Sequence, residues 1–187
     1  MELFEVRWHG RGGQGAWTAS QLLALAAIRE GAYAQSFPEF GPERGGAPIQ
    51  AFTRISSKPI RIHSNVYTPD AVVVLDPTLL KSINVAAGVK KDGVLVINFE
   101  EAYEDLIKKL KERTGLEIWV VKATKIAVSE LGTGITNTAM LGALLKARGL
   151  VKLDTVFSVV KERFKGEVAE KNLRVISRAY EEVKKFG

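Results

Sequence analysis

The residues with the clearest potential for chemistry lie near the start of the chain, at positions 10–15. Three glycines there have the G-x-G-x-x-G spacing, in which missing β-carbons allow a tight turn and a close approach of the backbone to a ligand. The free N–H groups and the dipole of a helix that follows such a turn favour a phosphate or a carboxylate. The predicted cofactor-binding residues are Gly10, Arg11, Gly12, Gly13, Gln14 and Gly15. The alternative is that the glycines only form a compact corner between two elements.

The elements on either side of this glycine loop fit a ligand site. Residues 3–9 alternate between apolar and polar types, which predicts a strand, and residues 16–30 predict a largely apolar helix. His9 closes the strand beside the glycines, either as a donor to a bound anion or as a structural residue. A dinucleotide site also needs an acidic residue about 20 positions further on, at the end of the second strand. Glu30 falls in the helix and Glu39 in a loop, which argues against a standard NAD site.

Other familiar catalytic patterns are missing from the sequence. No serine occupies a G-x-S-x-G elbow, and no Walker lysine follows the glycines. The chain has no cysteine, which excludes disulfides, thiolate zinc sites and cysteine-ligated iron–sulfur clusters. Its 2 histidines cannot form a His-rich metal site. We therefore predict no catalytic residue and no metal site here, and any redox chemistry must involve a cofactor or a partner chain.

The charge pattern and the hydropathy of the chain indicate which kinds of partner it can bind. The net charge is +6, but lysine and arginine are interspersed with acids in predicted helices, which is typical of solvated helix faces. Nucleic-acid binding would favour a stripe of one sign with interleaved aromatic residues, so no nucleic-acid partner is expected. No apolar run approaches the roughly 18–20 residues of a membrane span, and no signal-peptide pattern follows Met1. We expect a cytoplasmic protein that does not bind a membrane.

The remaining patterns predict an α/β fold. Further strands are expected at residues 32–37, 49–55, 59–64, 71–75, 93–98 and 116–121, and further helices at 101–113, 124–131, 136–143, 153–164 and 168–185. The short connection 56–58 predicts an antiparallel hairpin, so the sheet should be mixed, although mostly parallel. Residues 1–187 are expected to form a single domain of three α/β/α layers. Asp76 follows the apolar run 71–75, either in a ligand crevice at the sheet's carboxyl edge or as a helix cap.

Residues 37–48 interrupt every regular pattern. Three prolines and three glycines within twelve positions indicate a defined loop, and its phenylalanines and charges offer contacts to a partner. The alternative is that both phenylalanines turn inward and fix the loop to its own domain. The predicted partner-interface residues are Phe37, Glu39, Phe40, Glu43 and Arg44.

Five segments together resemble the gamma subunit of the 2-oxoacid:ferredoxin oxidoreductases, a family that includes the pyruvate and 2-ketoisovalerate enzymes. They are WHGRGGQGA at 8–16, FPEFGPERGGAP at 37–48, VVVLD at 72–76, NTAMLGA at 137–143 and AEKN at 169–172. The resemblance spans nearly the whole chain, and several motifs in order are far more specific than the glycine loop alone.

The resemblance implies a non-autonomous subunit of a larger enzyme. Such an enzyme oxidatively decarboxylates a 2-oxoacid to acyl-CoA and CO₂ and reduces ferredoxin. By this resemblance, thiamine diphosphate and iron–sulfur clusters belong to the alpha, beta and delta partner chains, and coenzyme A is a substrate. The choice between pyruvate and 2-ketoisovalerate stays open, as does the sharing of one gamma chain between two enzymes. An alternative is a stand-alone α/β module that binds a nucleotide or CoA without redox partners.

Overall fold

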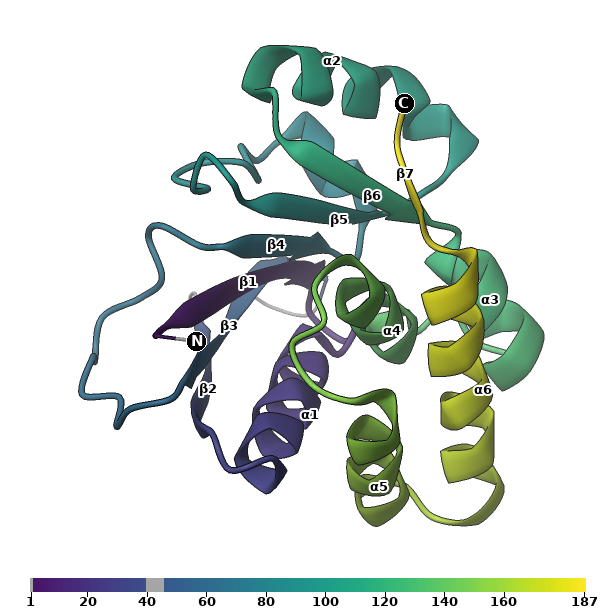
Figure 1. The fold of residues 1–187 in the computed structure, drawn as a ribbon. Helices are drawn as coiled ribbons and strands as arrows, with labels where there is room; N and C mark the ends of the chain where they lie inside the picture. Colours follow the sequence, from purple (N-terminus) through teal and green to yellow (C-terminus); the bar gives the residue numbers. More distant parts are fainter. Residues whose placement is uncertain (1, 40–45) are drawn as a thin grey trace.

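A computed structural model describes residues 2–39 and 46–187. Figure 1 shows a twisted sheet with helices on both of its faces. The strand order is β2-β3-β1-β4-β5-β6-β7. The strands are β1 Phe4–Arg11, β2 Tyr33–Glu39, β3 Pro48–Ser56, β4 Ala71–Val74, β5 Val94–Asn98, β6 Glu117–Val121 and β7 Lys184–Lys185.

The mixed α/β sheet is confirmed. Strands β1, β4, β5 and β6 are parallel to one another, whereas β3 pairs antiparallel with both β1 and β2, and β7 pairs antiparallel with β6. The parallel character therefore holds for the four central strands only, and antiparallel pairs flank them on both sides. Strand β4 is buried along its whole length inside the sheet, as its unbroken apolar sequence predicts.

The predicted strand at 59–64, and with it the hairpin at 56–58, is wrong. Residues 57–70 form an irregular connection, and the antiparallel partners of β3 are β1 and β2. The buried Arg54 explains the difference, because its guanidinium donates to the carbonyls of Ile62, Ser64 and Asn65. These acceptors are therefore satisfied by a side chain and not by a neighbouring strand. Strand β7, which the sequence did not predict, adds two residues beside β6.

Two apolar cores lie on opposite faces of the sheet. The larger core includes Trp8, Leu23 and Met140, and the smaller core includes Ile97 and Ile107. This arrangement confirms the three-layer prediction. The helices of the larger core are α1 Ala16–Arg29, α3 Ala123–Leu131, α4 Asn137–Ala147, α5 Leu153–Arg163 and α6 Gly166–Glu182; the short helices η1 Pro77–Lys81 and η2 Glu101–Tyr103 and the helix α2 Glu104–Thr114 complete the set. Within the described residues, no helix is long and apolar enough to cross a membrane.

Helix α4 is central to the thicker layer, and it contacts α6 closely. A β-carbon placed on Gly142 would lie 2.4 Å from the carbonyl oxygen of Ile176, so the two backbones touch at a position that only glycine permits. One turn away, the hydroxyl of Thr138 donates to Asn172 Oδ1 over 2.8 Å. Segments 137–143 and 169–172, far apart in the sequence, are thus joined by a buried polar contact and a close backbone contact.

Candidate functional site

The glycine loop lies at the point where the sheet changes its direction of winding. Strands β1 and β4 are parallel neighbours, and α1 follows β1 on one face while η1 follows β4 on the other. Open α/β sheets bind their ligands outside the carboxyl ends of the strands at such a point. The topology therefore places the candidate site around the loop 10–15 and Asp76.

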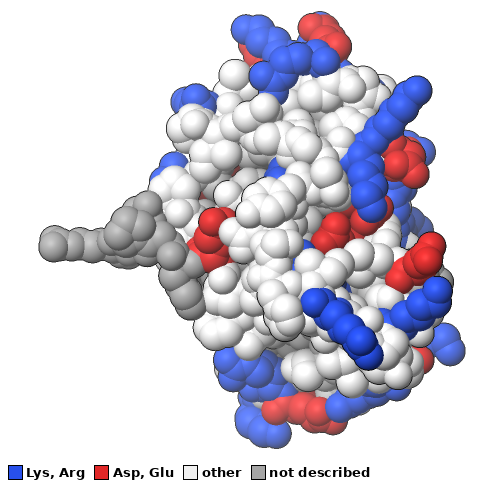
Figure 2. Space-filling view, turned by 90° about the vertical axis from the view of Figure 1, so that its left-hand side faces the viewer, with Lys and Arg blue, Asp and Glu red and all other residues white. Residues whose placement is uncertain are grey.

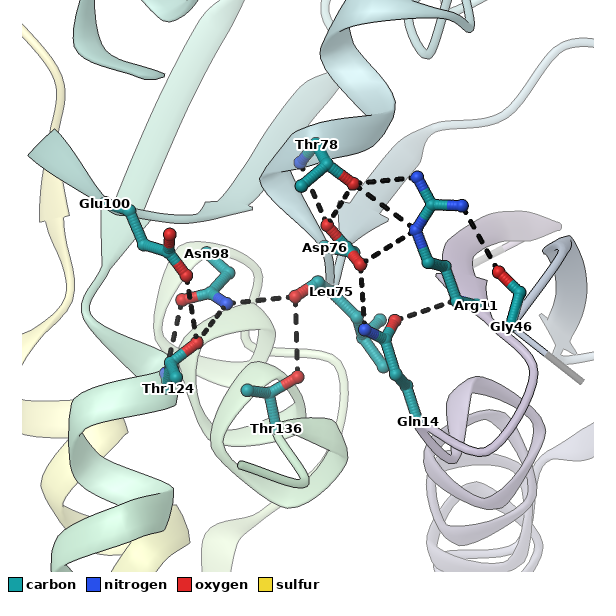
Figure 3. Close-up of polar contacts among 10 residues, drawn as sticks. All are labelled: Arg11, Gln14, Gly46, Leu75, Asp76, Thr78, Asn98, Glu100, Thr124 and Thr136. Atoms are coloured by element: carbon teal, nitrogen blue, oxygen red, sulfur yellow. Dashed lines mark hydrogen bonds and ion pairs between the residues drawn. The ribbon is translucent and has the colours of Figure 1, made fainter. Parts of the chain in front are cut away.

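Asp76 is the centre of the first polar cluster at this edge (Figure 3). Its Oδ2 accepts from Arg11 Nε at 3.1 Å and from Gln14 Nε2 at 2.9 Å. Its Oδ1 accepts from the backbone N–H and the hydroxyl of Thr78 at 2.9 and 2.6 Å. Arg11 also donates to Thr78 Oγ1 at 2.8 Å and to the carbonyl of Gly46 at 3.2 Å. The first cluster ties the glycine loop to the end of β4.

The contacts of Asp76 confirm the helix-cap interpretation, because its side chain caps η1 through Thr78. Partial burial raises the pKa of Asp76, but the hydrogen bonds from Thr78 and Gln14 and the charge of Arg11 outweigh it and hold the pKa below its ordinary value. Asp76 is therefore ionised at neutral pH and offsets the charge of Arg11. Because Arg11 and Gln14 are both bound to Asp76, this side of the loop offers little free cationic character to an anion.

A second polar cluster lies beside the first, at the end of β5 (Figure 3). Asn98 Nδ2 donates to the carbonyl of Leu75 at 2.9 Å and to Thr124 Oγ1 at 2.8 Å, and Asn98 Oδ1 accepts from the Thr124 N–H at 3.3 Å. Thr136 Oγ1 also donates to the Leu75 carbonyl, at 3.4 Å. These bonds satisfy the Asn98 amide and join the ends of β4 and β5 to α3 and to the start of α4.

The backbone of the glycine loop makes a tight turn between β1 and α1, in which the Gln14 N–H donates to the Arg11 carbonyl at 3.0 Å. Gly13 and Gly15 have φ values of 91° and 78°, in the left-handed region that favours glycine. The Gly12 N–H donates to the Ala47 carbonyl at 3.0 Å, and the Arg11 N–H donates to Gln14 Oε1 at 2.7 Å. These two donors are therefore engaged within the chain. Contact of the loop with a ligand stays a prediction, and Gly13 and Gly15 line a cavity.

The predicted partner-interface residues are only partly described. Phe37 lies in β2, with its ring centroid 5.1 Å from that of Phe52 and its face 5.1 Å from the guanidinium carbon of Arg54. Glu39 ends β2 and accepts from Asn65 Nδ2 at 3.0 Å. The ring of Phe37 thus contacts its own domain. Phe40, Glu43 and Arg44 lie outside the described residues.

His9 is buried in β1, with 2% of its surface exposed. Its Nε2 accepts from Arg7 Nε at 3.1 Å, so the proton of the neutral ring is on Nδ1, which has no partner among the described residues. Burial, with a smaller contribution from the charge of Arg7, lowers the pKa of His9 to about 3. The ring is therefore a neutral structural group at physiological pH, in line with the structural alternative.

The free energy of unfolding should fall as the pH is lowered from about 6.5 toward 3, because the unfolded chain takes up a proton at His9 that the folded chain excludes. The contribution of His9 to the free energy of unfolding is complete above the ordinary pKa of histidine. As the pH falls below that pKa, the contribution is lost by at most about 1.4 kcal/mol per pH unit. Urea unfolding at several pH values measures this slope. His9→Gln should flatten it, whereas the same change at the exposed His63 should not. Equal slopes in the unmodified chain and His9→Gln would contradict the prediction.

Sequence reasoning missed several residues that the fold brings to this edge. The pattern that pointed to Asp76, a polar residue at the end of an apolar strand, also occurs at Asn98. It could have identified Asn98 and, through Asn98, its partner Thr124. Asn137 and Lys171 belong to the segments 137–143 and 169–172, yet their proximity to the glycine loop depends on the packing of α4 against α6. A β-carbon on Gly15 would lie 2.5 Å from Asn137 Nδ2, which shows how closely these segments meet.

Comparisons with known proteins identify the family of this chain. The chain belongs to the pyruvate ferredoxin/flavodoxin oxidoreductase family, whose model matches residues 5–182. The pyruvate/ketoisovalerate oxidoreductases common subunit gamma of Pyrococcus furiosus is 52% identical over 184 residues, which are 98% of this chain and 99% of that protein. The pyruvate synthase subunit PorC of Methanocaldococcus jannaschii is 46% identical over 186 residues, covering 99% and 100%.

Solved structures show the same fold. The crystal structure of pyruvate oxidoreductase subunit PORC from Thermotoga maritima matches with a TM-score of 0.86 and 44% identity, over the full length of both chains. A 2-oxoglutarate:ferredoxin oxidoreductase from Magnetococcus marinus matches with a TM-score of 0.77 at 20% identity, over 96% of this chain and 30% of that chain. The latter likeness concerns the fold alone, and it shows that this fold also occurs as one part of a longer chain.

Proposed function

We propose that this chain is the gamma subunit of a 2-oxoacid:ferredoxin oxidoreductase, acts as a single domain and is cytoplasmic. The assembled enzyme oxidises and decarboxylates a 2-oxoacid, transfers the acyl group to coenzyme A and passes the electrons to ferredoxin. The observation that carries the proposal is similarity over nearly the full length of proteins named as gamma or PorC subunits. Pyruvate and 2-ketoisovalerate both occur in the names of these relatives, and both are candidate substrates.

The absence of cysteine supports a division of labour between chains. Iron–sulfur clusters are held by cysteine thiolates, and this chain offers none. In the proposed complex the clusters and thiamine diphosphate belong to alpha, beta and delta subunits, and the gamma chain contributes binding and orientation. The glycine loop then contacts a phosphate of coenzyme A or of thiamine diphosphate at a subunit boundary. Its support is the pair of left-handed glycines at the start of α1.

The surface offers faces for such partners. Figure 2 shows the side from which β1 and β4 begin, where Lys and Arg lie mainly around the periphery and uncharged residues fill much of the centre. Ile62 and Tyr67, in the connection between β3 and β4, are 39% and 70% exposed. Exposed aromatic and aliphatic groups are typical of the centre of a protein interface. We propose that this face and the segment 37–48, which begins in β2 and ends at the start of β3, contact partner subunits.

Recovery of the chain from native extract should bring larger partner chains with it. Tagged and purified gently, the complex should contain thiamine diphosphate and show iron–sulfur absorbance, because these groups belong to the partners. It should reduce ferredoxin only when coenzyme A and a 2-oxoacid are both present. Assays with pyruvate and 2-ketoisovalerate then distinguish the substrates. A chain recovered alone that binds a nucleotide tightly would contradict the proposal and favour the stand-alone binding module.

A further inference from the structure

Strand β1 carries a buried cation that is bound to neutral acceptors. Arg7 is 6% exposed. Its Nε donates to His9 Nε2 at 3.1 Å, and its Nη2 donates to the carbonyls of Val85 and Ala87 at 3.0 and 2.6 Å. None of the ion pairs within the described part of the chain includes Arg7. Because a guanidinium stays charged in proteins, a full positive charge is buried here without a carboxylate from the described residues.

Arg54, on the same face of the sheet, shows the usual arrangement of a buried arginine. Arg7 and Glu5 are two residues apart in β1, and Arg54 lies opposite Glu5 in β3, so the three side chains share one face. Arg54 binds the Glu5 carboxylate over 2.8 Å. The carboxylate of Asp70 accepts from the Glu5 N–H and is bound to Lys90 over 2.7 Å. These two acids are therefore engaged by other cations.

The burial of Arg7 without a counter-ion is unfavourable. Desolvation disfavours the charged form and lowers the pKa of Arg7. Hydrogen bonds to neutral groups satisfy its donors but supply no negative charge. Next to Arg7, the Nδ1 of His9 is a buried donor without a partner among the described residues. Both groups lack an acceptor, and violations of this kind are expected at functional positions.

The segment that binds Arg7 reaches an exposed part of the surface. Ala87 is exposed and is followed by Gly88. A β-carbon placed on Gly88 would lie 2.0 Å from the carbonyl oxygen of Tyr67, so the two backbones touch. Tyr67 is 70% exposed and belongs, with Ile62, to the connection between β3 and β4, which extends away from the sheet in Figure 1. Because its backbone is fixed by this contact, less entropy is lost when a partner covers the ring.

We propose that a carboxylate of a partner subunit binds Arg7, with Tyr67 as an aromatic anchor beside it. Charge complementarity selects an Asp or Glu side chain, which supplies the missing negative charge. The bonds within the described part of the chain are made by Nε and Nη2, so the carboxylate is expected at Nη1. Arginine and tyrosine are among the residues that contribute most to binding at interfaces. The identity of the partner rests on the proposed function, whereas the unbalanced charge belongs to the chain itself.

Hydrogen exchange tests the position of this interface. The isolated full chain is compared with the complex that is purified by way of the same chain. In the complex, amides of residues 62–68 and 85–89 should exchange about 10-fold more slowly or less, because a partner covers them. A complex that contains thiamine diphosphate but leaves these amides unprotected overturns the proposal, while the proposed function stands. A chain recovered without partners overturns both.

Three variants test the side chains. A variant and the unmodified chain, with different tags, are produced together with the partner chains, and their ratio in the purified complex gives the relative affinity. Arg7→Met and Tyr67→Ala should each lower this ratio by about 30-fold or more. Arg61→Met removes an exposed cation of the same connection and should change the ratio by less than about 3-fold. A ratio for Arg7→Met as small in its change as that for Arg61→Met overturns the proposal.

The isolated chain separates assembly from stability. Arg7→Met should lower the urea midpoint of unfolding less than Arg54→Met does, because no carboxylate is left buried without its cation. Glu43 lies outside the described residues and is tested in the same way. If Glu43→Gln lowered the midpoint as much as Arg54→Met, the carboxylate would belong to this chain, and the proposal would be overturned. Should Arg7→Met fail to fold, the ratio for Tyr67→Ala decides, because that side chain is exposed.

Discussion

Replacing Arg54 by methionine should lower the free energy of unfolding by about 3–5 kcal/mol. The side chain of Arg54 is 1% exposed, and its Nε donates to Glu5 Oε1 over 2.8 Å. Without it, the carboxylate of Glu5 stays buried and loses its counter-ion. The carbonyls of Ile62, Ser64 and Asn65 lose their donor as well. Urea unfolding of the variant and of the unmodified chain measures the difference.

A second substitution separates the charge from the packing. In the Arg54→Met background, Glu5→Gln removes the unpaired charge, and it should restore part of the lost free energy. The pair Arg29 and Glu162 is a matched surface control, because its side chains are 39% and 64% exposed. Arg29→Met should change stability little, since exposed ion pairs contribute little. If Arg54→Met were as mild as Arg29→Met, the account of a buried, necessary ion pair would be wrong.

Gly142→Ala should lower the free energy of unfolding by about 2 kcal/mol. The added β-carbon would lie 2.4 Å from the carbonyl oxygen of Ile176, so α4 and α6 must move apart. Overpacking of this kind costs about 1–3 kcal/mol, and the better helix propensity of alanine returns about 1 kcal/mol at most. A shift of this size lowers the melting temperature by about 4–8 °C in a chain of this length.

Gly149 provides the control for this substitution. It lies between α4 and α5, and a β-carbon placed on it would meet no atom within 4 Å. Gly149→Ala should therefore leave the melting temperature nearly unchanged. Since α6 also carries Lys171 and Asn172, a displaced α6 in Gly142→Ala should alter the cavity beside the glycine loop. A variant that melts like the unmodified chain would show that the two helices separate without cost.

The parts of the fold that depend on local sequence could be predicted. The arrangement of β1, glycine loop and α1 follows from residues close together in the chain, as does the buried strand β4. The false strand at 59–64 has a different origin. Its residues have strand-like propensities, but Arg54 of β3 donates hydrogen bonds to the carbonyls of Ile62 and Ser64. These side-chain bonds replace the bonds to a neighbouring strand, and only the folded structure shows them.

Only the part of the candidate site that lies within one continuous segment could be predicted. The glycine spacing identified the loop and its tight turn, and the left-handed conformation of Gly13 and Gly15 became evident only in the structure. The hydrogen bonds from Arg11 and Gln14 to Asp76 could not be predicted. They connect the ends of two strands that are 60 residues or more apart in the sequence. Asn137 was seen only as part of a motif, since its position beside Gly15 depends on the packing of α4.

The two outer strands of the sheet restrict how the chain can assemble. An exposed strand edge is a template for pairing with the backbone of another chain, and short strands and lysines oppose such pairing. Strand β7 has two residues, Lys184 and Lys185, both exposed, and it covers part of β6. At the opposite edge, β2 contains Pro38, which has no N–H to donate. Growth of the sheet from one chain into the next is therefore disfavoured on both sides, and association through side chains on loops and faces is left as the available route.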